Sequence, residues 1–92
     1  MALLNEQEIQ TQLQQLPGWT LNGNAITWVK TLRNFVEAIA FVNQIVDPAE
    51  TANHHPDLAI SYNKVTITLS THDAGGLTQK DFDLAKILSS LT

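Results

Sequence analysis

The stretch Leu58-Ala-Ile-Ser-Tyr-Asn-Lys-Val-Thr-Ile-Thr-Leu-Ser70 decides the fold of this chain. Apolar residues alternate with small polar residues on both sides of Asn63-Lys64, which is the period-two pattern of strands that bury one face. We therefore expect two antiparallel strands joined by a tight connection at Asn63-Lys64. Such a hairpin is stable only when further elements cover its apolar face, so the rest of the chain must supply them.

A helix and another hairpin are expected before this stretch. Asn5 is a suitable N-cap and is followed three residues later by a glutamate, so a first amphipathic helix should begin there. Residues 19–21 and 25–31 are rich in β-forming residues and flank Asn22-Gly23, which is a strong short-range hairpin signal. The chain therefore carries two predicted hairpins.

A second helix is expected between the two hairpins. Asn34 is a suitable N-cap, and the apolar stripe that should face the sheet consists of Phe35, Ala38, Ile39, Val42, Ile45 and Val46. Phe41 lies off this stripe, which leaves two readings open: an isolated exposed side chain or a contact between subunits. Asp47-Pro48 is itself a helix-start signal, so we expect a kink or a fresh helical turn at Asp47.

A third helix should follow the loop at residues 73–76. Thr78 is its expected N-cap, and Asp81 is expected to stabilise its N-terminus. The complete order is α-β-β-α-β-β-α. This order predicts an α+β fold in which a single four-stranded antiparallel sheet carries three helices on one face, within one domain spanning residues 1–92.

Composition restricts the function further. The chain has 92 residues, of which 43% are hydrophobic and 15% charged, which is typical of one small globular domain. Five basic against nine acidic residues leave a net charge of −4, which argues against binding to nucleic acid. There is no cysteine, so disulfides and thiolate metal sites are excluded. We find no signal peptide and no membrane-spanning run, and we expect a cytoplasmic protein without a membrane partner.

The three histidines fall in two short segments, Glu50-xxx-His54-His55-Pro56 and Ser70-Thr71-His72-Asp73. Each segment lies where a structural element should end, and His55 precedes a proline, which favours an exit from the second helix there. Imidazole can both donate and accept a proton near neutral pH. The grouping therefore predicts an acid–base site.

These segments resemble the pterin-4a-carbinolamine dehydratase family. The resemblance rests on the motifs Glu50-xxx-His54-His55-Pro56, Tyr62-Asn63-Lys64-Val65 and Thr71-His72-Asp73-Ala-Gly75-Gly76-Leu77-Thr78, together with Asp81 at the start of a helix. The family's fold, a four-stranded antiparallel sheet with three helices on one side, agrees with the order of elements obtained from caps and periodicity.

The resemblance implies dehydration of a 4a-hydroxytetrahydropterin to the quinonoid dihydropterin, the recycling step after an aromatic amino acid hydroxylase. No metal or organic cofactor is implied. By position, His54 and His72 would be general acids, while His55 would bind substrate and assist as a base. Glu50 precedes His54 by four residues and would orient an imidazole if the last turn is regular, although a capping role explains it equally well. The residues expected to line the pterin pocket are His54, His55, Pro56, Thr71, His72 and Asp73.

Two other functions stay open at this stage. Some relatives act as dimerisation cofactors of a homeodomain transcription factor, so the chain could be a binding module. A metal site built from Glu50, His54, His55 and His72 is the other alternative, although adjacent histidines point apart in an extended chain. A homodimer or homotetramer is expected through an edge strand or the outer face of the second helix.

Overall fold

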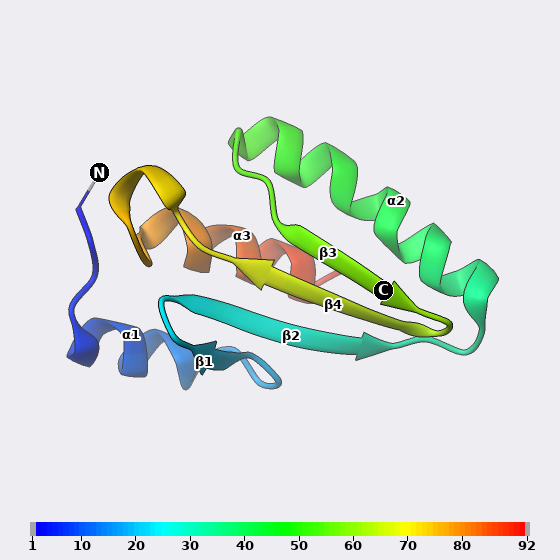
Figure 1. The fold of residues 1–92 in the computed structure, drawn as a ribbon, viewed down its shortest axis with the longest axis horizontal. Coiled ribbons are helices and arrows are strands. Elements are labelled where there is room, and N and C mark those ends of the chain that lie inside the picture. The colour runs from blue at the N-terminus through cyan, green and yellow to red at the C-terminus, as the bar shows by residue number, and fades with distance from the viewer. Residues whose placement is uncertain (1, 92) are drawn as a thin grey trace.

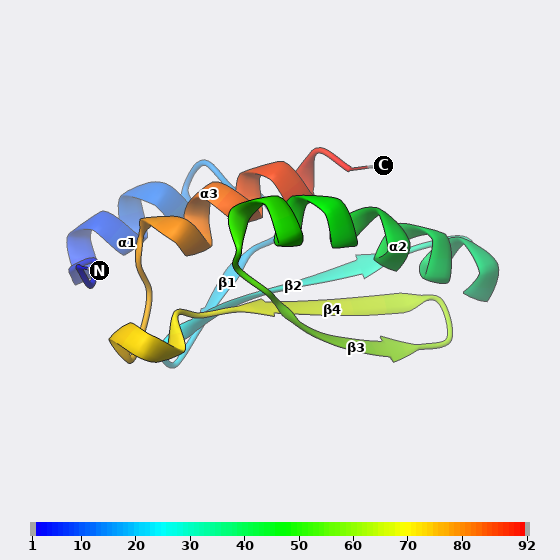
Figure 2. The same cartoon turned by 90° about the horizontal axis from the view of Figure 1, so that it is seen from above.

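The computed structural model describes residues 2–91, which form one antiparallel sheet with three α-helices on one of its faces (Figures 1 and 2). The elements are α1 (Glu6–Leu13), β1 (Thr20–Asn22), β2 (Ala25–Thr31), α2 (Phe35–Ala52), β3 (Asp57–Ser61), β4 (Lys64–Leu69), the 3-10 turn η1 (His72–Ala74) and α3 (Gln79–Ser89). The strands are ordered β1-β2-β4-β3. The predicted α+β class, element order and one-sided placement of the helices are confirmed.

The strand register buries the apolar face of the sheet under the helices. In β4, Val65, Ile67 and Leu69 are fully buried and alternate with half-buried threonines. β3 pairs with β4 so that Leu58 lies opposite Ile67. The two-residue loop between them is Tyr62-Asn63, one residue earlier than expected, because Ser61 and Lys64 are the last paired residues and Tyr62 adopts a positive φ of 52°.

Helix α2 is rotated relative to the predicted apolar stripe. Its buried residues are Ala38, Phe41, Ile45 and Ala49, whereas Phe35 and Val46 are 50% and 52% exposed. The expectation that Phe41 lies off the buried face is therefore wrong. Phe41 is 3% exposed, and its ring lies edge-on to that of Trp28 with 6.1 Å between the ring centroids. The face of α2 that carries Phe41 therefore packs against the sheet.

The same helix continues through Pro48 without a new start at Asp47. A proline inside a helix removes one backbone hydrogen bond, but the buried Ile45 and Ala49 before and after it hold both parts of α2 on the core. The expected fresh helical turn at Asp47 is therefore not formed.

Helix α3 completes the core beside α2. Its buried apolar residues are Phe82, Leu84, Ala85 and Leu88. The indole of Trp19, just before β1, donates a hydrogen bond to Ser89 Oγ at 2.8 Å and fixes the far end of α3. Within residues 2–91, no helix is long and apolar enough to cross a lipid bilayer.

Candidate active site

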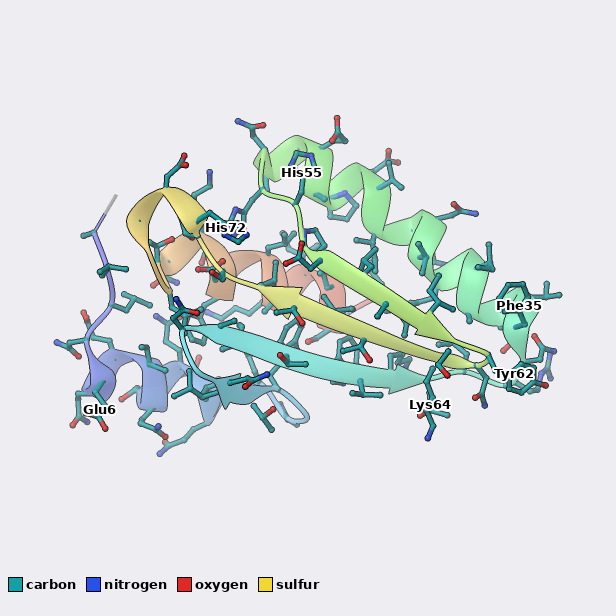
Figure 3. All side chains as sticks on the ribbon, in the orientation of Figure 1. Glu6, Phe35, His55, Tyr62, Lys64 and His72 are labelled. Atoms are coloured by element: carbon teal, nitrogen blue, oxygen red, sulfur yellow. The ribbon has the colours of Figure 1, made fainter. Side chains whose placement is uncertain are left out.

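The ends of α2 and β4 meet near the start of α3, at one end of the sheet (Figures 1 and 2). A pocket of about 460 Å³ opens there, and its lining residues are Asn53, His54, His55, Ser70, Thr71, His72, Asp73 and Lys80. All three histidines of the chain line this pocket. Figure 3 shows His55 and His72 at this end of the molecule, opposite the end that carries Phe35, Tyr62 and Lys64.

The end of α2 determines where the two adjacent histidines point. Asn53 adopts the left-handed conformation at φ 50°, and its N–H bonds to the carbonyl of Glu50. The N–H of His54 then bonds to the carbonyl of Ala49 at 3.0 Å, which completes a Schellman-type ending. The chain leaves the helix axis at this point, so His54 is buried and His55 is exposed.

His54 is held by a buried carboxylate on α3. Its Nε2 lies 2.6 Å from Oδ1 of Asp81, and the two side chains are 10% and 0% exposed. Oδ2 of Asp81 accepts hydrogen bonds from Thr71 Oγ1 and Thr78 N, both at 2.9 Å. The carboxylate of Asp81 can only accept hydrogen bonds. Nε2 of His54 is therefore the donor, and Nδ1 is the atom left to meet a ligand.

Glu50 contacts His55 rather than His54. Its Oε2 hydrogen-bonds with Nε2 of His55, and the side chains are 67% and 57% exposed. The expected alignment of Glu50 with His54 fails because the helix ends at Ala52, before His54 can complete the turn. Solvent screens such an exposed pair, so Glu50 orients His55 only weakly.

His72 is presented by the short turn that follows β4. The carbonyl of Thr71 accepts hydrogen bonds from the N–H groups of Ala74 and Gly75, at 3.1 and 3.0 Å, and Gly75 takes a positive φ of 79°. This tight turn holds the exposed His72 at the rim of the pocket. The arrangement thus places one buried and two exposed imidazoles around one cavity.

A family model described as Pterin 4 alpha carbinolamine dehydratase matches residues 2–91. The chain belongs to the pterin-4a-carbinolamine dehydratase family. It is 61% identical over 90 residues to a protein of Cyanothece sp. (strain PCC 7425 / ATCC 29141) named "Putative pterin-4-alpha-carbinolamine dehydratase", covering 98% of this chain and 93% of that protein. A protein of Thermomicrobium roseum with the same name is 46% identical, covering 99% and 98%.

A solved structure of the family has the same fold. It is described as "Crystal structure of transcriptional coactivator/pterin dehydratase from Brucella Melitensis". Its TM-score to this chain is 0.92 at 34% sequence identity, with 98% of each chain covered. The arrangement of sheet and helices described above is therefore that of a known member of the family.

Most residues expected at the pterin pocket lie together in the structure. His54, His55, Thr71, His72 and Asp73 line the same cavity. Pro56 and Glu50 instead line an adjacent groove of about 240 Å³. His55 lines both this groove and the cavity. The remaining lining residues of this groove are apolar: Val42, Ile45, Val46, Ala49 and Leu58.

Sequence reasoning missed two parts of the site. Asp81 was expected only to cap α3, and nothing in the spacing of 27 residues indicated its bond to His54. Lys80 was not expected at the pocket at all. Within residues 2–91, no group of three or more histidine, aspartate or glutamate side chains is placed to hold a metal ion, so the alternative set Glu50, His54, His55 and His72 does not form one.

Proposed function

We propose that this chain converts a 4a-hydroxytetrahydropterin to the quinonoid dihydropterin and water by histidine acid–base catalysis. The observation that carries the proposal is the convergence of His54, His55 and His72 on one pocket, with a buried carboxylate behind His54. Membership of the pterin-4a-carbinolamine dehydratase family supports the pterin as the substrate class.

The reaction breaks the bond between C4a and the hydroxyl oxygen. A general acid must protonate this hydroxyl so that it leaves as water, and a base must take a proton from a ring nitrogen. We assign the acid role to His54, through Nδ1, and to His72, and the supporting base role to His55 with Glu50. General acid–base catalysis of this kind contributes typically ~10²–10⁴-fold in rate.

Substrate binding is assigned to the walls of the same pocket. We assign substrate binding to Thr71, His72 and Asp73 on one wall of the pocket and to Pro56 beside His55; the backbone of Thr71 is itself bonded within the loop, so backbone contacts to the substrate fall to His72 and Asp73. Neither a metal nor an organic cofactor takes part in the proposed reaction. We place it in tetrahydropterin recycling after an aromatic amino acid hydroxylase, and a cytoplasmic location remains a prediction from the sequence.

The test is the dehydration of enzymatically generated 4a-hydroxytetrahydropterin, followed by ultraviolet absorbance. His54→Ala and His72→Ala should each lower kcat/KM by about two decades or more. Lys64→Ala, at the opposite end of the molecule, is the control and should behave as the native protein (Figure 3). A folded native protein that does not exceed the spontaneous rate would contradict the proposal.

A second candidate function is binding of a protein partner, including a second copy of the chain. The coactivator part of the Brucella protein's description favours this candidate. The exposed apolar residues also favour it: Phe35, Val36 and Val46 on α2, and Leu58 and Ile60 on β3. We propose a homodimer or homotetramer that uses the free edge of β3, whose five residues are all exposed.

Light scattering after size-exclusion chromatography tests this assembly. Ile60→Lys should give a monomer, whereas Lys64→Ala should keep the native mass. A native protein that is monomeric at high micromolar concentration would contradict the proposed assembly.

A further inference from the structure

Thr71 connects the two segments that carry the proposed acids. Its backbone closes the loop of His72, because its N–H bonds to the carbonyl of Gly76 at 2.9 Å and its carbonyl accepts from the loop. Its side chain points the other way, into the protein, and donates to Oδ2 of Asp81 at 2.9 Å. Thr71 is 4% exposed, so bulk water does not compete with the hydrogen bonds of its backbone or its hydroxyl.

The directions of the hydrogen bonds around Thr71 follow from its single hydroxyl hydrogen. Thr71 gives this hydrogen to Asp81, so in its 2.9 Å contact with the hydroxyl of Thr78 it must accept. The result is a directed chain from Thr78 to Thr71 to Asp81. Bonds in such a chain polarise one another, and here they draw negative charge toward Oδ2, away from the oxygen that holds His54.

We propose that the hydroxyl of Thr71 is a positioning group that keeps His54 a sufficiently strong acid. The inference rests on the proposed function, in which His54 donates the proton to the leaving hydroxyl. Without the hydroxyl, more of the negative charge of Asp81 remains on Oδ1 and attracts the protonated imidazole more strongly. His54 then holds its proton more tightly and donates it less readily.

Other charged groups face the same pocket and must be distinguished from this effect. They are His55, paired with Glu50, at the end of α2; His72 and Asp73 in η1; and Lys80 at the start of α3. Replacing Thr71 by valine changes none of these charges and keeps the shape of the side chain. A change in the titration of His54 therefore reports the lost hydroxyl.

The experiment is an NMR titration of the three histidine rings in the native protein, Thr71→Val and Thr71→Ser. Thr71→Val should move the titration midpoint of His54 to a higher pH than in the native protein. Thr71→Ser keeps the hydroxyl and should restore the native midpoint. The midpoint of His55, whose partner is Glu50, should not move and serves as the internal control.

Thr78→Val is a second variant in case Thr71→Val does not fold. It should move the titration midpoint of His54 in the same direction by a smaller amount, because it removes the first donor of the hydrogen-bonded chain. The inference is overturned if His54 titrates identically in folded valine variants and native protein, or if it stays in one protonation state in all of them. Equal shifts of His54 and His55 would also overturn it. Because NMR needs no turnover, this result is independent of whether the native protein has dehydratase activity. If it has, the alkaline limb of its pH–rate profile, where the general acid loses its proton, should move to higher pH together with the titration of His54.

Discussion

Asp81→Asn separates the role of Asp81 as a helix cap from its role as the partner of His54. Asparagine has the same shape, and its carbonyl oxygen can take the place of Oδ2, which accepts from Thr71 and Thr78. Its amide nitrogen then takes the place of Oδ1 and faces Nε2 of His54 as a donor. The imidazole must accept at Nε2, so its hydrogen moves to Nδ1 and the stabilising charge is lost.

Two magnitudes follow from this geometry. Replacing the buried charge-assisted bond by a neutral one should lower the free energy of unfolding by about 1–3 kcal/mol. Loss of a properly held acid should reduce kcat/KM by about 10²-fold or more, which corresponds to roughly 2.7 kcal/mol of activation barrier. The loss of kcat/KM should be present without urea, where the variant is fully folded, so it cannot be explained by unfolding.

The assay combines urea unfolding, followed by circular dichroism, with the absorbance assay of dehydration. Asp83→Asn is the matched control: Asp83 is exposed on the same helix and accepts a hydrogen bond from Gln79. We expect it to remain within about 0.5 kcal/mol and about twofold of the native protein. If Asp81→Asn lowers stability but leaves kcat/KM within about twofold of native, the bond between Asp81 and His54 is only structural, and the assignment of His54 as an acid held by Asp81 is refuted.

Three further predictions concern the helix that leads to the site. Phe41→Ala should lower the free energy of unfolding by about 3–5 kcal/mol, because it opens a cavity beside Trp28, and Val36→Ala on the exposed side should change it by less than about 0.5 kcal/mol in the same urea titration. Asn53→Ala should cost roughly 1 kcal/mol by calorimetry because alanine resists the left-handed conformation, whereas Asn53→Gly should stay close to native; equal losses would show that the conformation is not the cause. Glu50→Gln should lower kcat/KM by less than about tenfold because its pair with His55 is exposed, and a loss as large as that of His54→Ala would show that Glu50 takes part in the chemistry directly.

The order of elements could be predicted because its signals are local. Caps such as Asn5 and Thr78 and the alternation in β4 lie within a few residues of the structure that they specify. The rotation of α2 could not be predicted in the same way. Its apolar residues cover a broad arc, and the choice of Phe41 over Phe35 for burial depends on Trp28, which belongs to a different hairpin.

The candidate site, like the fold, has a part that could be predicted from local signals and a part that depends on tertiary packing. That the histidine segments lie at the ends of α2 and β4 could be read from the sequence, since a proline and paired glycines mark the two exits. The sequence did not reveal which carboxylate bonds to which imidazole. Helical spacing paired Glu50 with His54, whereas the left-handed Asn53 and the packing of α3 bring Asp81 to His54 and leave Glu50 to His55.

Adjacent placement of His54 and His55 also affects how the gene can change. The two side chains face opposite environments, one against Asp81 and one in solvent, and only their distance from the end of α2 decides which is which. Deleting one codon between Pro48 and His54 would bring His55 to the buried position opposite Asp81 and move His54 into the left-handed position that Asn53 now holds. This segment should therefore tolerate insertions and deletions far less well than most single substitutions.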